Sequence, residues 1–224
     1  MLSSGGIGTC DTATRFPIRL VESGPAAGAL AAALIGGLTG AVRVFSFDMG
    51  GTTAKTCLID DGTPAVATDF EGDGVYQYKK GSGLPVRVPV IEMVEIGAGG
   101  GSIARVDAMG LLKVGPQSAG AVPGPLCYGR GATEPTVTDA DLLLGCLNAD
   151  YFLGGTMRLD VESALRGMET LGTRLGMAWQ QVAEGISDVV NENMANMARV
   201  HAAERGKDLR QYTLIALVRA RARV

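Results

Sequence analysis

One short segment places a carboxylate, two glycines and two hydroxyls together, in the order Asp48, Gly50, Gly51, Thr52 and Thr53. Glycines let the backbone turn several N–H groups toward one point, and the threonines add hydroxyl donors. A carboxylate in this position could hold a hydrated Mg²⁺ beside a bound anion. The segment therefore predicts a site for nucleotide phosphates. An ordinary β-hairpin turn is the structural alternative.

The flanking residues indicate that this segment connects two strands. Apolar runs lie on both sides of it, and we expect strands at 42–48 and 54–59. The loop between them should be a tight turn in which Gly50 or Gly51 has a positive φ. The sequence Asp-Asp-Gly at 60–62 predicts a further turn after the second strand.

A second glycine-rich segment, Gly97 to Ser102, resembles a dinucleotide-binding fingerprint only superficially. That fingerprint needs a following helix, whose N-terminus faces the pyrophosphate. Here an apolar run follows and predicts a strand, so we reject that interpretation. The glycine N–H groups could still bind an anion or a substrate amide, and a plain strand connection is the alternative.

Polar residues also gather near Thr136. Thr138, Asp139 and Asp141 follow at short spacing, and Asp139 is expected to be the N-cap of a helix. Arg130 lies in a loop rich in proline and glycine, and its guanidinium could pair with a phosphate or carboxylate or form a surface salt bridge. The single histidine, His201, is expected to be a helix-face residue, because one histidine is a thin basis for a zinc site or a catalytic triad.

The remaining patterns predict an α/β chain whose strands come mostly before its helices. Helices are expected at 26–35, 139–147, 160–175 and 179–205, a hairpin at 103–114, a structured loop at 116–135, and a closing strand at 212–217 that should be buried and paired.

Composition excludes several classes of protein. Hydrophobic residues make up 46% and charged residues 19% of the 224 residues, and the net charge is −3, so nothing suggests a nucleic-acid partner. The four cysteines contain no C-x-x-C pair, which favours reduced thiols and a cytoplasmic protein. The apolar run Ala26–Val42 is short for a membrane span, so we expect a buried helix there.

The segment around Asp48 resembles the second phosphate loop of the actin, Hsp70 and sugar-kinase ATPases. More closely, the chain resembles the hydantoinase A and 5-oxoprolinase family over roughly residues 1–216. Further segments carry this match in the family's order, namely LVESGPAAG at 20–28, IGAGGGSIA at 96–104, GPQSAG at 115–120 with PGPLCYGRG at 123–131, and EPTVTDAD at 134–141.

The resemblance implies part of an actin-like, ribonuclease-H-like ATPase domain, with a mixed sheet, glycine-rich loops and C-terminal helices. It implies ATP-dependent hydrolysis of a cyclic amide such as 5-oxoproline, which belongs to glutathione metabolism, or a hydantoin. ATP would phosphorylate the amide oxygen and make the ring carbon open to water. The implied cofactors are ATP and Mg²⁺. The implied partners are a small cyclic-amide substrate and a companion subunit or domain, with no nucleic acid or membrane.

The resemblance also assigns roles to individual residues. Asp48 and Thr52 would be catalytic, and Asp48 would bind Mg²⁺ through a metal-bound water. The phosphates would be bound by Gly50, Gly51, Thr52, Thr53 and Lys55, and the substrate side would be lined by Gly99, Gly100, Gly101, Ser102 and Arg130.

The chain departs from the family pattern in three respects. Relatives are longer and carry another Asp-x-Gly-Gly-Thr loop near their start. Many relatives have an acid in place of Lys55. Relatives also continue into a Gly-Gly-x-Gly-Pro segment that contacts the nucleotide, where this chain has an alternating Arg/Ala tail at 217–224. We therefore expect a fragment, with one partial domain at 1–216 followed by an aberrant tail.

Three other functions stay open at this stage. The chain could be the ATP-using subunit of an acetone-carboxylase-type complex, which shares these motifs. It could be a small-molecule kinase, although no sugar-binding carboxylate is identifiable. It could also be a truncated fragment without catalytic activity.

Overall fold

A computed structural model describes residues 1–72 and 84–218 of the chain. The chain divides into two compact units. Unit 1 comprises Met1–Asp48, Lys55–Val94 and Val200–Leu217, and unit 2 comprises Met49–Ala54, Glu95–Arg199 and Val218–Val224. Each unit is described by itself below. The predicted tail lies outside the described residues from position 219 onward.

Unit 1 begins with two short helical segments, α1 (Cys10–Arg15) and the 3₁₀ helix η1 (Pro17–Leu20), followed by the long helix α2 (Ser23–Thr39). Helix α2 is longer than the sequence predicted, and it ends at Gly40, which adopts the left-handed conformation. Its buried face consists of small residues, which let the helix approach the sheet closely: Ala26, Ala29, Ala32, Ala33 and Gly36.

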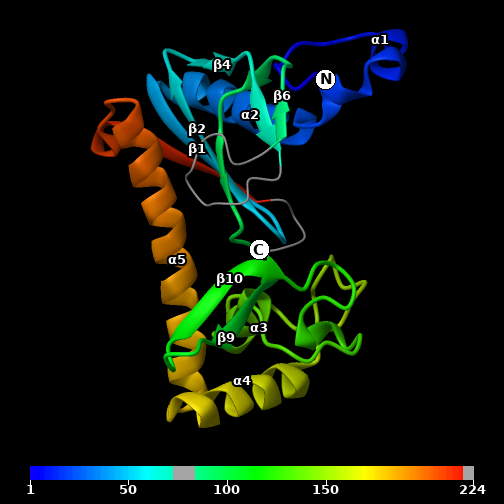
Figure 1. The fold of residues 1–224 in the computed structure, drawn as a ribbon, viewed down its shortest axis with the longest axis vertical. Coiled ribbons are helices and arrows are strands. Elements are labelled where there is room, and N and C mark those ends of the chain that lie inside the picture. Colours follow the sequence, from blue (N-terminus) through cyan, green and yellow to red (C-terminus); the bar gives the residue numbers. More distant parts are fainter. Residues whose placement is uncertain (73–83, 219–224) are drawn as a thin grey trace. The chain divides into compact units, whose positions relative to one another are not determined.

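The sheet beneath α2 has the strand order β11-β1-β2-β3, and β8 pairs with β2 on a separate path. Figure 1 shows α2 lying across β1 and β2. The strands are β1 (Arg43–Met49), β2 (Ala54–Asp60), β3 (Thr63–Pro64), β8 (Val94–Ile96) and β11 (Thr213–Val218). The expected turn joins β2 to β3, and Asp61 and Gly62 both have positive φ there. Shorter strands form two further pairs, β4 (Val66–Ala67) with β7 (Val90–Ile91) and β5 (Phe70–Gly72) with β6 (Leu84–Val86).

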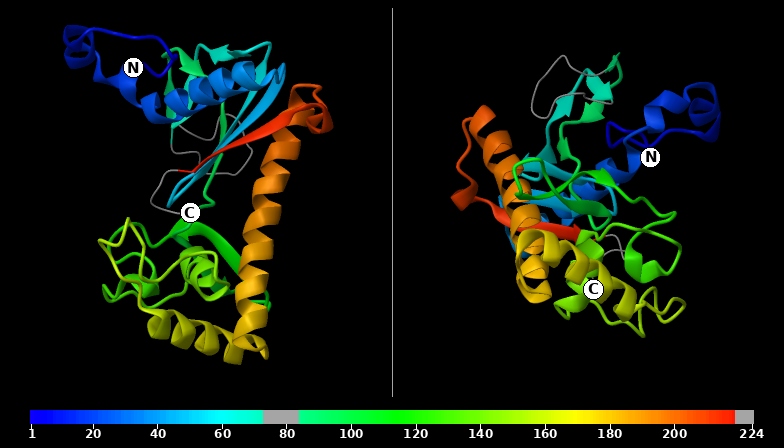
Figure 2. Two further views of the ribbon diagram at one scale, coloured as in Figure 1. Left: turned by 180° about the vertical axis from the view of Figure 1, so that it is seen from behind. Right: turned by 60° about the horizontal axis from the view of Figure 1, so that its bottom comes forward.

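The closing strand was predicted to be paired and buried, and only the first half of that prediction is right. Strand β11 pairs with β1 at the edge of the sheet, as the red strand in Figure 2 shows. Ile215 and Leu217 pack against the core below α2, but Leu214, on the opposite face, is 62% exposed. Side chains alternate between the faces of a strand, so an edge strand covered on one face buries only every second residue.

In the part of the chain that the structure describes, one helical stretch, Pro17–Thr39, is long and apolar enough by length and composition to cross a membrane. The sequence predicted a buried helix here, and the structure buries one face of α2 only. The alanine face packs against the sheet, whereas Leu34 and Leu38 on the outer face are 66% and 79% exposed.

Unit 2 contains the predicted hairpin, formed by β9 (Ser102–Val106) and β10 (Leu112–Ser118) in antiparallel register. After it come the 3₁₀ helix η2 (Leu126–Tyr128), the short helix α3 (Val137–Leu143) and helix α4 (Val161–Leu175). Asp160 caps α4 by accepting a hydrogen bond from Ser163 N, as the sequence predicted. Helix α5 (Trp179–Glu204) follows and agrees closely with the predicted range. The 3₁₀ helix η3 (Leu209–Gln211) then leads into β11.

The prediction that Asp139 is an N-cap was wrong. Thr136 is the N-cap of α3, and Asp139 is the third residue of a capping box. The Asp139 carboxylate is fully buried and also accepts hydrogen bonds from the N–H groups of Leu126 and Cys127. It therefore ties the proline- and glycine-rich loop to the start of α3. His201 is buried at 3% exposure on α5.

Candidate functional site

The Asp-x-Gly-Gly-Thr-Thr segment forms the loop of the β1–β2 hairpin, as its flanking residues predicted. Gly50 N donates to Thr53 O at 2.9 Å and closes the loop, and Asp61 N donates to Val42 O at 2.9 Å where the two strands end. Paired residues of a regular hairpin have residue numbers that add up to one constant value. Both bonds give the same value, so the strands keep one register along the hairpin. That register places Asp48 opposite Lys55.

The predicted positive φ at Gly50 or Gly51 was wrong. Neither glycine adopts the left-handed conformation, although fourteen other glycines in the described chain do. A Cβ added to Gly51 would meet nothing within 4 Å, so the loop does not need glycine there for space either. The strict requirement for glycine lies instead on the segment that packs beneath the loop.

The second glycine-rich segment supports the hairpin loop directly, and both belong to unit 2. Gly100 N donates to Gly50 O at 3.1 Å, and Gly101 N donates to Gly51 O at 2.6 Å. A Cβ on Gly99 would lie 2.7 Å from Gly51 C and from Thr52 N, closer than real Cβ atoms approach other atoms. Only glycine at position 99 permits this backbone-to-backbone contact.

This contact fixes the direction of the loop amides. In a trans peptide the C=O of one residue and the N–H of the next point in opposite directions. Because the carbonyls of Gly50 and Gly51 face the supporting segment, the N–H groups of Gly51 and Thr52 face away from it. Within residues 1–72 and 84–218 these two N–H groups and the hydroxyls of Thr52 and Thr53 make no hydrogen bond. Gly51 and Thr52 are exposed, so their donors are available to an anion.

The supporting segment is itself held by buried hydroxyls. Gly99 N donates to Ser102 Oγ at 2.9 Å. Both the N–H and the hydroxyl of Thr138 donate to Gly100 O, at 2.7 and 2.8 Å. Gly99, Gly100, Gly101 and Ser102 are all buried. In this structure they contact the loop at 50–53 from behind, and the substrate-facing role that the resemblance gave them stays a prediction.

From the sequence, Thr138 could be identified only as a member of an acidic and hydroxyl cluster. Its contact with Gly100 could not be read from the sequence, because 38 residues separate the two.

Unit 1 places a charged cluster at the residues that flank the loop. Lys55 Nζ lies 2.8 Å from Glu22 Oε2, and the two side chains are only 15% and 12% exposed. Glu22 immediately precedes α2, and its N–H donates to the Oγ of the fully buried Ser3 at 3.0 Å. Helix α2 also passes close to Asp48, since a Cβ on Gly28 would lie 3.8 Å from Asp48 Oδ2. Sequence reasoning missed Glu22, which is 33 residues from Lys55.

The side chains that are present as potential metal ligands decide what kind of metal site this region could form. No group of three or more histidine, cysteine, aspartate or glutamate side chains in the described part of the chain could hold a metal ion. Mg²⁺ in nucleotide sites is commonly held by one or two carboxylates, waters and the substrate phosphates. A single carboxylate, Asp48, beside a loop with free donors fits that mode, and it does not fit a metal cage made by the protein alone.

Arg130 makes its contacts within its own loop. Its Nη1 donates to Ala121 O at 2.9 Å, and its guanidinium lies 5.6 Å from the centre of the Tyr128 ring. These contacts account for the position of the side chain, and its predicted role at the substrate side stays a prediction.

Comparison with known proteins places this geometry in context. Residues 1–218 match the family model described as Hydantoinase/oxoprolinase. The chain is 44% identical to an uncharacterised protein of Methanocaldococcus jannaschii, over 96% of the chain and 32% of that protein. It is 39% identical to the caprolactamase subunit alpha of Pseudomonas jessenii, over 95% of the chain and 30% of the subunit.

Two solved structures are also similar to the chain. The ATP-dependent caprolactamase from Pseudomonas jessenii superposes with a TM-score of 0.79 at 35% identity, covering 98% of this chain and 30% of that one. The nucleotide-free acetone carboxylase, from a study of ATP-dependent acetone carboxylation, superposes with a TM-score of 0.80 at 26% identity, covering 96% of this chain and 29% of that one. The chain thus spans about a third of the length of the relatives it matches.

Proposed function

Because the chain belongs to the hydantoinase/oxoprolinase family, we propose that it forms the phosphate-binding part of an ATP-dependent cyclic-amide hydrolase. The observation that carries this proposal is the backbone arrangement at Gly50 and Gly51. Their carbonyls are bonded to the supporting segment, so the N–H groups of Gly51 and Thr52 face an open side of the loop. Donors that are fixed before the ligand arrives bind an anion without a further ordering cost.

In this proposal each loop residue has a defined task. The N–H groups of Gly51 and Thr52 and the hydroxyls of Thr52 and Thr53 bind phosphate oxygens, and Gly50 closes the loop. Asp48 would hold Mg²⁺ through a bound water, and the ion would neutralise phosphate charge when bound. Lys55, oriented by Glu22, would add a fixed positive charge. Phosphoryl transfer depends largely on such positioning and charge neutralisation, so no covalent protein nucleophile is required.

The proposed substrate is a lactam or a related cyclic amide. Transfer of the γ-phosphoryl group to the amide oxygen releases ADP and weakens the ring C–N bond, so that water can add to the ring carbon and the ring nitrogen can leave as an amine. This step leaves an acyl phosphate, which a second water hydrolyses to the carboxylate and free phosphate. The 39% identity with a caprolactamase subunit supports this choice. We further propose that the chain is half of an actin-like ATPase domain, works in the cytoplasm, and acts with a companion subunit, since that relative is named as a subunit.

A chimera tests the proposed function. Residues 1–218 of this chain would replace the matching segment of the caprolactamase subunit alpha, and phosphate release would be measured with ε-caprolactam, 5-oxoproline and hydantoin. We expect release that depends on one of these amides and is lost in the Asp48→Ala variant. A chimera that binds ATP and folds as judged by circular dichroism, yet releases no phosphate with any of the three amides, would contradict the lactam assignment.

A carboxylase subunit is the second candidate, because the acetone carboxylase structure superposes with a TM-score of 0.80. The same chimera would then release phosphate with acetone and bicarbonate and would ignore the cyclic amides. Both candidates use the same phosphate loop, so this comparison changes the substrate assignment and leaves the loop assignment untouched.

A further inference from the structure

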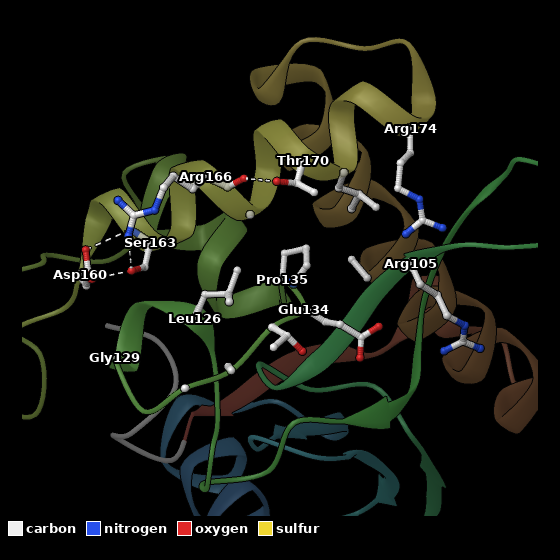
Figure 3. A pocket seen from close by; sticks show the side chains of 16 residues that line it. Arg105, Leu126, Gly129, Glu134, Pro135, Asp160, Ser163, Arg166, Thr170 and Arg174 are labelled. Carbon is white, nitrogen blue, oxygen red and sulfur yellow. Dashed lines mark hydrogen bonds between the residues drawn. The ribbon is translucent and has the colours of Figure 1, made fainter.

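Unit 2 contains a second candidate site, which the proposed function does not use. A pocket of about 520 Å³ lies between α4, β9 and the loop at 129–135. This volume falls within the range of small-molecule sites. Figure 3 shows Arg105 and Arg174 at one end with Glu134 between them and Pro135, and Asp160, Ser163 and Arg166 at the other end.

Three charged side chains in the wall are held by neighbours. Asp160 accepts hydrogen bonds from the N–H and the hydroxyl of Ser163, at 3.0 and 2.5 Å. The Arg166 guanidinium donates to the same Ser163 hydroxyl at 2.9 Å. The Arg105 guanidinium donates to Gln117 Oε1 on the neighbouring strand. Each of these side chains therefore has a hydrogen-bond partner within the protein.

Two further charges have no such partner. Glu134 and Arg174 make no hydrogen bond or ion pair with any residue in the described portions of the chain. They carry opposite charges and line the same pocket, and yet they do not pair with each other or with the charges beside them. One end of the pocket therefore offers an available carboxylate together with two guanidinium groups.

The middle of the pocket is apolar, and the elements that form its walls are closely packed. Leu126 and Pro135 lie between the two charged ends (Figure 3), and Leu171 also lines the pocket. Ala104 N donates to Pro135 O at 2.8 Å, which fastens the loop to β9. A Cβ on Gly167 would overlap Leu126 Cδ1, so α4 and η2 are packed as closely as their backbones allow. The apolar surface adjoins the end that carries Arg105, Arg174 and Glu134.

We propose that this pocket binds a free α-amino acid with a neutral, apolar side chain. Arg105 and Arg174 would bind its carboxylate, because a guanidinium matches a carboxylate in both charge and geometry. Glu134 would accept hydrogen bonds from its ammonium group. The side chain would lie along Leu126, Pro135 and Leu171. A ligand with only a negative charge would make no bond to Glu134 and would lie beside this carboxylate, which repels it. The two arginines and Glu134 together therefore favour a zwitterion.

The test uses four six-carbon probes that differ only in their charged groups: L-norleucine, 6-aminohexanoate, hexanoate and 1-aminohexane. Calorimetry with the whole chain, in the absence of ATP, should show norleucine binding with a dissociation constant of 1 mM or below. Hexanoate and 1-aminohexane, which each lack one charge, should bind at least tenfold more weakly. The ω-amino isomer should also bind more weakly than norleucine, because Glu134 lies at the same end of the pocket as the two arginines.

Variants assign the binding to this pocket. Glu134→Gln and Arg174→Met change exposed side chains, so both should fold normally and lower norleucine affinity at least tenfold. Glu169→Gln on α4 and Arg158→Met, which lie outside the pocket lining, are the matched controls and should leave affinity unchanged. Equal binding of hexanoate and norleucine would overturn the proposal in favour of a simple anion site. The absence of norleucine binding at 20 mM, or equal binding by the Glu134→Gln variant, would also overturn it. None of these results bears on the phosphate loop.

Discussion

At the scale of single residues, the site depends on two glycines that do not themselves face the open side of the loop. Gly99 and Gly101 allow one backbone to lie directly on another, and their contacts orient the amides of Gly51 and Thr52. The sequence drew attention to Gly50 and Gly51, because a Gly-Gly turn suggests positive φ. The structural requirement lies 48 residues further along the chain, at a position where any side chain would push the loop away.

Two alanine substitutions distinguish Gly99, where the supporting contact requires glycine, from Gly51, where it does not. In Gly99→Ala the new Cβ would lie 2.7 Å from backbone atoms of the loop, so we expect a loss of about 1–3 kcal/mol in the free energy of unfolding. The amides of Gly100 and Gly101 should also exchange with solvent much faster. In Gly51→Ala nothing lies within 4 Å of the new Cβ, so stability and exchange should stay near those of the wild type. Hydrogen exchange followed by NMR measures both, and equal protection in the two variants would argue against the supporting contact.

At the scale of elements, local patterns predicted the structure wherever a local interaction decides it. The Asp160 cap, the turn at Asp61 and Gly62, and the hairpin β9–β10 were all predicted from neighbouring residues, and all are confirmed. The exposure of β11 and the Glu22–Lys55 pair were not predicted. Both depend on which elements lie side by side in the fold, and a local pattern carries no such information.

Helix α2 offers a matched pair of tests, because two adjacent glycines meet different surroundings. A Cβ on Gly36 would lie 2.5 Å from Val44 Cγ2, whereas a Cβ on Gly37 would meet nothing within 4 Å. Gly37→Ala should therefore raise the free energy of unfolding by about 0.5–1 kcal/mol, through helix propensity alone. Gly36→Ala should lower it by about 1–3 kcal/mol, because it overpacks the contact with β1. Denaturant titration measures both, and a stabilising Gly36→Ala would show that α2 does not pack on β1 as described.

The end of β2 carries a pH-sensitive contact. Asp60 accepts hydrogen bonds from Lys207 Nζ at 2.7 Å and from the Tyr212 hydroxyl at 2.6 Å. Partial burial by itself would raise the pKa of Asp60, but these two hydrogen bonds together with the positive charges of Lys207 and Arg43 outweigh it and hold the pKa below its usual value. A carboxyl whose pKa is lower in the folded state stabilises the fold above its unfolded pKa, near 3.9, and this contribution is lost as the pH falls through the folded pKa.

Asp60→Asn should therefore reduce stability at pH 7 and flatten the loss of stability between about pH 5 and pH 3. Asp61→Asn is the matched control, because asparagine tolerates the left-handed conformation that Asp61 adopts. Among residues 1–72 and 84–218, the Asp61 carboxylate makes no hydrogen bond or ion pair like those of Asp60. Thermal unfolding at pH 7, 5, 4 and 3 compares the two. If the Asp60→Asn and wild-type curves run parallel over this range, the contact does not contribute to acid sensitivity.

At the scale of the whole molecule, the family could be identified from five separated motifs, and the family model then matched residues 1–218. Composition and periodicity alone would not have reached that result, because they indicate only an α/β chain. The chain spans about a third of the length of these relatives. What the described residues do supply is a loop at 50–53 whose amides are oriented from behind by the segment at 99–101.

If the open amides of Gly51 and Thr52 bind phosphate, their chemical shifts should change when nucleotide is added. The ¹⁵N-labelled chain would be titrated with MgATP to 10 mM, with Gly99→Ala titrated in parallel. We predict that the largest shifts occur at Gly51, Thr52 and Thr53, with a dissociation constant in the millimolar range, about 4 kcal/mol of binding free energy. The shifts should be absent in Gly99→Ala. Unchanged resonances at Gly51 and Thr52 at 10 mM MgATP, with shifts elsewhere or none at all, would contradict the account.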